Sequence, residues 1–328
     1  MRRFLLLQCV LAVPVTVSVA VSVAVSVAVF PHDVRAGEAA DPRREGATLL
    51  NAVPATGLVH VDGRGRVVYT SPTRQSPLYF PSGREPALSP DHEQLIYWES
   101  NHEGSAPLQI ADLAAGTSRR FLDGNLRSPH FSPDGNSVLY GAMVGSNWSV
   151  MITSTTSPAG RPLFVTDDSL FQPSWQPDGR GVLASSLRDL YFIGLDGKLQ
   201  RRVPIAELGR SRSGSSADRF RLCPTAPHRV LFSARASMAP ETVDHFKGGF
   251  TSSALFIYDF DSKQRTRVTD EYVWAAQPSW SRDGRYIFFR GVRVSAGSKS
   301  AAIEEGILRI DADGTHMVRV ASGDEPGL

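Results

Sequence analysis

The sequence predicts an all-β fold: a β-propeller of four-stranded blades arranged in a ring, with six blades as the expected number. Two observations carry this prediction. A short motif that contains a tight-turn tetrapeptide recurs along the chain, and its first three clear copies begin 43 and 44 residues apart. Each copy is followed by short runs of β-branched and aromatic residues, which favour strands. An interval of this length holds four such strands, which is the content of one propeller blade.

Each complete copy of the motif has a proline, a large apolar residue two positions later, a turn such as Ser132-Pro133-Asp134-Gly135, and an apolar strand. In that turn proline fixes φ at the second position and glycine closes the fourth, so each copy predicts a β-hairpin. Four copies are clear and one is degenerate; they begin at Pro86, Pro129, Pro173, Pro278 and, for the degenerate copy, Arg221. We expect five blades to start at these positions.

Residues 47–85 provide the sixth blade. There Val61-Asp62-Gly63-Arg64 stands in for the first turn, and Val67-Val68-Tyr69 for the second strand. Closing the ring hides the edges of the sheets from other chains. We therefore expect the N-terminal strand to complete the sheet of the C-terminal blade.

The motif resembles the TolB-type β-propeller repeat, whose core is Pro-x-Trp-Ser-Pro-Asp-Gly followed by an apolar strand. Segments 173–179 and 278–284 carry the resemblance most clearly, since both have tryptophan at the third position. The resemblance covers about residues 47–328, which we expect to form a single propeller domain. TolB itself carries an N-terminal α/β domain. We expect none here, because the apolar N-terminal segment leads directly into the first blade.

The N-terminal segment predicts export. Arg2 and Arg3 precede an apolar stretch from Phe4 to Phe30, and Val34-Arg35-Ala36 offers a small-residue cleavage site. We therefore expect residues 1–36 to be a signal peptide, residues 37–46 a linker, and the mature protein to be periplasmic or secreted. The alternative is an uncleaved membrane anchor, because about 20 apolar residues span a bilayer.

Charge excludes some classes of partner. The chain has 35 basic and 33 acidic residues, a net charge of +2; removing residues 1–36 leaves 32 of each sign. A mature chain of zero net charge is not steered towards nucleic acid or an anionic membrane. Of the two cysteines, Cys9 lies in the predicted signal peptide, so Cys223 is left alone and no intramolecular disulfide is expected.

Two sets of repeated residues invite functional interpretation, and both are better explained by structure. The turn aspartates recur in phase, and we expect them to bond their own turn backbone; they are Asp91, Asp134, Asp178 and Asp283. Large residues recur two positions after the blade proline, and we expect them to pack between blades; they are Leu88, Phe131, Trp175 and Trp280, with Cys223 in the same position as a buried thiol.

A metal site in the channel is the sharper hypothesis for His130, which follows a blade proline. Resemblance to propeller enzymes that degrade uronate polymers implies a metal held by channel His and Gln residues, and Gln172 and Gln277 each precede a blade proline. Such a site needs several histidines, yet other blades carry Ala or Ser where blade three has His130. No Gly-x-Ser-x-Gly, Walker loop or Cys-x-x-Cys is present either. We predict no metal, no cofactor and no catalytic residues.

The long insertions predict which face of the propeller binds a partner. Residues 206–219, 234–251 and 291–303 all fall in connections between blades or between second and third strands, which emerge on one face. Loops on a rigid scaffold commonly carry function. The candidate partner-binding residues on this face, with Tyr272 and Trp274 as exposed aromatic anchors, are His130, Gln172, Gln277, Asp167, Asp168, Asp270, Tyr272 and Trp274.

The function predicted from the sequence is that of an exported, non-catalytic, monomeric binding module or scaffold for a protein or polymer partner in the cell envelope. A propeller enzyme, either a polysaccharide lyase or a glycoside-acting protein with a site at the channel mouth, is one alternative. A component of a Tol-Pal-like envelope complex is the other. The fold by itself does not choose among them.

Overall fold

A computed structural model of the protein describes residues 53, 54, 56–99, 106–209, 214–245, 252–295 and 303–328. The chain divides into two units, Met1–Ala40 and Asp41–Leu328. The predicted signal peptide (1–36) and linker (37–46) lie outside the described residues. In the described part of the chain, no helix is long and apolar enough to cross a membrane.

Four sheets each contain four antiparallel strands in chain order. Blade 3 consists of β7 (Leu126–Phe131), β8 (Ser137–Val144), β9 (Asn147–Ser154) and β10 (Arg161–Pro162). Blade 4 consists of β11 (Phe171–Trp175), β12 (Gly181–Ser185), β13 (Asp189–Gly194) and β14 (Leu199–Pro204). Blade 5 consists of β15 (Arg221–Cys223), β16 (Ala226–Ala234), β17 (Ala254–Asp259) and β18 (Arg265–Arg267). Blade 6 consists of β19 (Val273–Trp280), β20 (Tyr286–Val294), β21 (Ile303–Asp311) and β22 (Val318–Ala321).

The fifth sheet has seven strands and contains two blades. Its order is β23 (Asp324–Gly327), β1 (Leu58–Val61), β2 (Arg66–Thr70), β3 (Leu78–Leu88), β4 (Gln94–Glu99), β5 (Leu108–Asp112) and β6 (Thr117–Leu122). The first half of β3 pairs with β2 as far as Ser82, and the second half pairs with β4 from Gly83 onward. Strand β3 therefore serves as the last strand of blade 1 and the first strand of blade 2.

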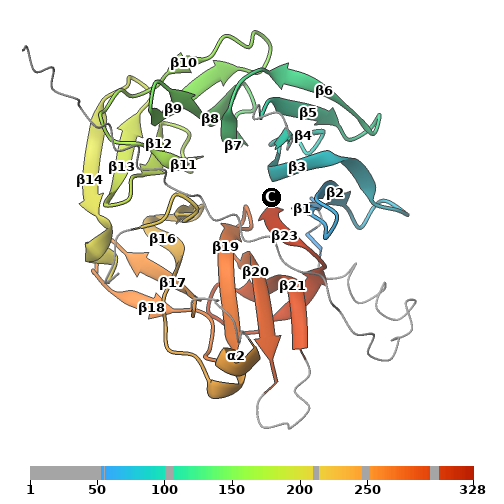
Figure 1. The fold of residues 1–328 in the computed structure, drawn as a ribbon, viewed down its shortest axis with the longest axis vertical. Coiled ribbons are helices and arrows are strands. Elements are labelled where there is room, and N and C mark those ends of the chain that lie inside the picture. Colours follow the sequence, from blue (N-terminus) through green and yellow to red (C-terminus); the bar gives the residue numbers. More distant parts are fainter. Residues whose placement is uncertain (1–52, 55, 100–105, 210–213, 246–251, 296–302) are drawn as a thin grey trace, which may run out of the picture. The chain divides into compact units, whose positions relative to one another are not determined.

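The described residues thus form six blades around a common centre, with the first strand of each blade innermost (Figure 1). The all-β propeller and the six blades predicted from the repeats are confirmed. Within the described connections there are two short helices: η1 (Ile205–Leu208) between blades 4 and 5, and α2 (Pro240–His245) between β16 and β17.

The predicted direction of ring closure was wrong. The N-terminal strand β1 does not join blade 6; instead the C-terminal strand β23 pairs with β1 and becomes the innermost strand of blade 1 (Figure 1). The turn at residues 62–65 consequently joins the second and third strands of blade 1, and residues 67–69 lie in its third strand. The final residues, Glu325-Pro326-Gly327-Leu328, repeat the pattern of Glu85-Pro86-Ala87-Leu88. Proline and leucine stand at matching positions in the two segments.

The turn aspartates bond their own turns, as predicted. In each turn the carboxylate accepts the backbone N–H two residues later, from Glu93, Asn136, Arg180 and Arg285 respectively. In three of the four turns the serine hydroxyl also donates to the aspartate. These bonds hold the pKa of Asp91 and Asp134 below the ordinary value, with the serine donor as the largest cause. The aspartates are therefore structural.

The residues two positions after each blade proline pack between neighbouring blades. Leu88, Phe131, Cys223 and Trp280 are buried and Trp175 is half-buried, each in an apolar cluster. Phe131 of blade 3, for example, shares a cluster with Ile96 of blade 2. The two tryptophans also join blades by hydrogen bonds: Trp175 Nε1 donates to the His130 carbonyl at 3.2 Å, and Trp280 Nε1 to the Arg221 carbonyl at 3.1 Å. The packing role predicted for these residues is confirmed.

Candidate functional site

One backbone feature recurs at the centre of five blades. The residue before each blade proline has a left-handed backbone, with φ between 49° and 54° at Glu85, Ser128, Gln172, Gln277 and Glu325. At each of them the innermost strand shifts its register with the second strand, which marks a β-bulge. Bulges and left-handed non-glycine residues gather at functional sites because they re-aim side chains.

These residues, with Arg219 in blade 5, form a chain of polar contacts that we call the inner belt: Glu325, Glu85, Ser128, Gln172, Arg219 and Gln277, one from each blade in turn. Its hub is the carboxylate of Glu85. Oε2 accepts from Trp98 Nε1 at 2.9 Å and from the Ser128 backbone N–H at 2.8 Å, and Oε1 accepts from Gln172 Nε2 at 2.6 Å. The Arg219 guanidinium lies 3.9 Å from Oε1.

Glu325 continues the inner belt through blades 1 and 6. Its Oε2 accepts the Glu85 backbone N–H at 2.7 Å, and its own N–H donates to Gln277 Oε1 at 3.2 Å. The strand that closes the ring is thereby bonded to the blades on both sides of it.

The two glutamates of the inner belt differ in charge state. Burial alone would raise the pKa of Glu85, but the Arg219 charge and the hydrogen bonds from Gln172, Ser128 and Trp98 hold that pKa below the ordinary value. The pKa of Glu325 is raised to about 7: burial is the largest cause, the Arg219 charge lowers it, and the neighbouring Glu85 charge raises it. Near neutral pH, Glu85 is the ionised member of the pair.

A cavity of about 190 Å³ lies in the channel next to the inner belt. The residue after each blade proline, and its counterpart in blade 5, lines this cavity; these residues are Ala87, His130, Ser174, Leu222, Ser279 and Gly327. Four of the six are Ala, Ser or Gly, and these small side chains leave the space open. The tryptophans Trp175 and Trp280 and the terminal Leu328 supply apolar wall.

The charged side chains in the cavity wall are Glu85, Arg219 and Arg221, together with the imidazole of His130. His130 Nε2 lies 3.4 Å from Arg221 Nη2, so it accepts a hydrogen bond from the guanidinium. Burial, then the charges of Arg221 and Arg219, put the pKa of His130 well below 6.5. Because its pKa is so low, the His130 imidazole is neutral. Burial, followed by the Arg219 charge, lowers the pKa of Arg221 to about 9.

The structure brings only part of the predicted partner-binding set together. His130 and Gln172 line the cavity, and Gln277 belongs to the inner belt. Asp167 and Asp168 are exposed in the connection between blades 3 and 4. The Asp167 carbonyl accepts from Asn147, and the Asp168 carboxylate accepts from the Tyr191 hydroxyl and lies 3.6 Å from Arg202 Nη2.

The prediction that Trp274 is an exposed anchor was wrong. Its side chain is 8% exposed and packs against Val292, Val294 and Met238. Strand β19 already begins at Val273, so Trp274 pairs with Val292 inside the sheet. Tyr272 is half-buried, and its N–H donates to the exposed Asp270.

Four central residues were missed from the sequence: Glu85, Glu325, Arg219 and Arg221. A signal existed for the glutamates, because each directly precedes a proline of the motif, as Gln172 and Gln277 do. Neither arginine had such a signal, because blade 5 carries Arg221 in place of the proline.

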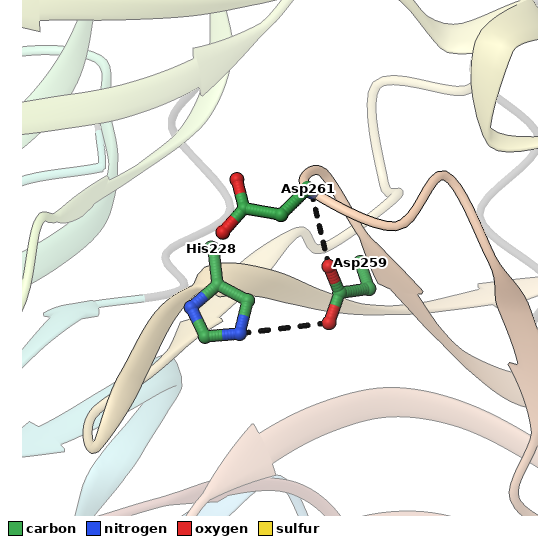
Figure 2. A group of neighbouring side chains, drawn as sticks. All are labelled: His228, Asp259 and Asp261. Atoms are coloured by element: carbon green, nitrogen blue, oxygen red, sulfur yellow. Dashed lines mark hydrogen bonds and ion pairs between the residues drawn. The ribbon is translucent and has the colours of Figure 1, made fainter.

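His228, Asp259 and Asp261 form a separate cluster whose ligand atoms all lie within 4.8 Å of one another (Figure 2). Asp259 is already committed to other bonds. Its Oδ2 lies 3.1 Å from Arg229 Nε and 3.5 Å from His228 Nε2, and its Oδ1 accepts the N–H groups of Asp261 and Ser262. Backbone donation from Ser262 is the largest cause that lowers the pKa of Asp259 to about 2. We assign the cluster to turn stabilisation.

No family model matches the sequence, and no curated protein matches it. Solved structures do match. TolB from Acinetobacter baumannii is 17% identical over 85% of this chain and 68% of its own, with a TM-score of 0.57. A TolB candidate from Agrobacterium tumefaciens is 17% identical over 81% of this chain and 88% of its own, with a TM-score of 0.51. Oligogalacturonate lyase from Vibrio parahaemolyticus is more distant, at 10% identity over 76% of this chain and 73% of its own, with a TM-score of 0.47. The predicted TolB-type propeller fold is confirmed, and at these identities the likeness shows the fold alone.

Proposed function

We propose that this chain is an exported, non-catalytic binding module that holds a protein partner on one face of the propeller. We call this the connection face; it carries the loops between second and third strands and the connections between blades. The opposite, turn face carries the short aspartate-closed turns. The observation that carries the proposal is the distribution of exposed apolar side chains between the two faces.

Nine large hydrophobic side chains of the described residues are exposed. Six of them lie on the connection face by their position in the strands: Met143, Val144, Val165, Leu187, Val243 and Ile303. The other three, Tyr79, Leu195 and Leu199, lie at turn-side ends of strands. An excess of exposed apolar groups on one side of the molecule supports a protein partner over a polar polymer.

The channel-enzyme alternative is favoured by one observation, the convergence of Glu85, His130, Gln172 and the two arginines. Their bonding argues for holding a ligand rather than transforming it. Every carboxylate oxygen of Glu85 already accepts a hydrogen bond, and its pKa lies below the ordinary value, which makes it a weak base. His130 Nε2 faces a donor from Arg221, so it is not free to take a proton.

The test compares two double variants in blade 4 and the connection that leads into it. Val165→Ser with Leu187→Ser removes apolar groups from the connection face, and Leu195→Ser with Leu199→Ser removes as many from the turn face. The mature chain is used to isolate a partner from envelope extract, and the purified partner is then titrated against each variant. We expect the first variant to bind at least about tenfold more weakly, and the second to match the parent. Equal binding by both variants, or a loss confined to the second, contradicts the proposal.

Export is tested separately by N-terminal sequencing of the protein recovered outside the cytoplasm. We expect it to begin at Gly37, because the cleavage site ends at Ala36. A chain that begins at Met1 and partitions with membranes shows the anchor instead.

A further inference from the structure

We infer that the channel cavity is a binding site for a small monocarboxylic acid, with Arg219 as its main contact. This site is distinct from the connection face and does not depend on the function proposed for that face.

The central observation is the state of Arg219. Its side chain is only 7% exposed and lines the cavity. Within the described residues its one polar contact is the ion pair with Glu85, whose atoms are 3.9 Å apart. That separation is beyond hydrogen-bond distance, so its guanidinium donors have no acceptor in the described protein. A buried cation without hydrogen bonds is costly, and an acceptor in the cavity would remove that cost.

Arg221 shows what a satisfied guanidinium looks like in the same wall. Its Nη1 donates to the carbonyls of Phe220 and Gln172, at 3.1 and 3.4 Å, and its Nη2 to His130. Arg221 is thereby fixed in place and adds a second positive charge next to Arg219. The difference between the two arginines indicates that Arg219 is the one kept for a ligand.

Charge selects a monoanion. The charged side chains that line the cavity are two arginines and the ionised Glu85, while His130 is neutral. Glu325, which also faces Arg219, is mostly protonated below pH 7. Below that pH one positive charge is left over, and a single carboxylate balances it. A dianion such as phosphate would leave an excess negative charge buried beside Glu85. The planar fork of a guanidinium also matches a carboxylate in two parallel hydrogen bonds.

The size and the walls of the cavity limit the acid further. The cavity of about 190 Å³ has room for roughly six water molecules, so the acid is small. Trp175, Trp280 and Leu328 offer its carbon skeleton an apolar wall.

The experiment titrates the mature chain by calorimetry with lactate, alanine, acetate and inorganic phosphate, each at millimolar concentrations. We expect the three carboxylates to bind, and phosphate to bind more weakly than any of them. Absence of binding by all three carboxylates overturns the inference. Phosphate as the tightest ligand overturns the choice of a monocarboxylate.

Variants separate a ligand contact from a structural role. Arg219→Gln should weaken the best carboxylate by at least about tenfold, whereas Arg202→Gln, at an exposed site of blade 4, should not. Arg219→Gln also removes the charge that keeps Glu85 ionised, so we expect a lower melting temperature without ligand, and that loss reports the ion pair rather than the ligand contact. Unchanged affinity in Arg219→Gln contradicts the inference. Arg219→Lys keeps the charge but loses the fork, and should bind with intermediate affinity.

Discussion

At the scale of single residues, the chain places non-glycine residues where the backbone is left-handed. Five of them are the positions before the blade prolines, and each costs about 1–2 kcal/mol relative to ordinary backbone. At Glu85 and Glu325 this cost is offset by hydrogen bonds, because the bulge turns both side chains into the inner belt. His92 has the same left-handed backbone, but its buried Nδ1 makes no hydrogen bond that would offset the cost.

We expect His92→Gly to stabilise the protein by about 0.5–1 kcal/mol, since relief of the left-handed strain exceeds the extra chain entropy of glycine. His92 has φ of 61° at the turn position where Gly135, Gly179 and Gly284 have 76°, 70° and 67°. Its buried Nδ1 also has no partner. The free energy of unfolding in urea measures the effect. His92→Ala, which loses the imidazole but keeps the strain, is the control; an equal gain there would rule out the backbone explanation.

At the scale of strands, the ring depends on β23 fitting between β1 of its own blade and β3 of blade 2. Gly327 has no room for a side chain: a Cβ there would lie 2.0 Å from the Pro86 carbonyl oxygen and 2.8 Å from Val59 Cγ2. We therefore expect Gly327→Ala to destabilise the protein by about 1–3 kcal/mol. Gly63→Ala, in the turn after β1 with nothing within 4 Å, should change stability by less than about 0.5 kcal/mol. Similar melting temperatures for the two variants would contradict this account of β23.

A second contact, between the turns of blades 6 and 2, spans blade 1 on the turn face. Blade 1 has no turn between its first two strands, because β23 and β1 come from opposite ends of the described chain. Arg282 of blade 6 reaches the turn of blade 2 instead, where its guanidinium donates to the carbonyls of Ser89 at 2.7 Å and Pro90 at 2.6 Å. Arg282 occupies the position that proline holds in the Ser-Pro-Asp-Gly turns.

We expect Arg282→Pro to lower stability by about 2 kcal/mol, although it restores the sequence of the repeat, because two charge-assisted hydrogen bonds are lost. Arg285→Ala, which breaks an exposed ion pair with Asp283 in the same turn, should cost less than about 1 kcal/mol. Chemical denaturation of both variants decides the matter. A neutral or stabilising effect of Arg282→Pro would show that the contact across blade 1 contributes nothing.

The elements that the sequence predicted correctly are those with local chemistry. The turns of blades 2, 3, 4 and 6 could be recognised because proline, aspartate and glycine act within four residues. Strand β23 could not be placed this way, since its partner β1 lies at the other end of the described chain. Trp274 is buried against Val292 and Val294 of its own sheet and against Met238, which comes from a distant insertion. Arg219 and Arg221 became visible as cavity residues only when the ring brought six innermost strands together.

At the scale of the whole molecule, the inner belt connects all six blades through two glutamates, so its charge state affects ring closure as a whole. Glu325 faces Glu85 and Asp324, which raise its pKa, and Arg219, which lowers it; Arg84 Nη1 lies 3.9 Å from its Oε1. His130 acts with the opposite sign. Its pKa is depressed, so the stability it contributes is present above pH 6.5 and is lost as the pH falls below that value. The two contributions overlap, and a variant is needed to isolate that of Glu325.

Glu325→Gln isolates it. The pKa of Glu325 is raised from 4.5 to about 7, so its contribution to stability is fully present below pH 4.5 and is lost as the pH rises towards 7. A glutamine can still accept the Glu85 N–H and does not ionise. We therefore expect the variant to equal the parent near pH 4.5 and to exceed it by about 1–3 kcal/mol above pH 7, with the difference growing between these values. Urea unfolding across this range measures that difference, and Glu304→Gln, at a half-exposed site on β21, is the control. A difference that stays constant with pH would mean that Glu325 is ionised throughout, and that the ring closes over two buried negative charges.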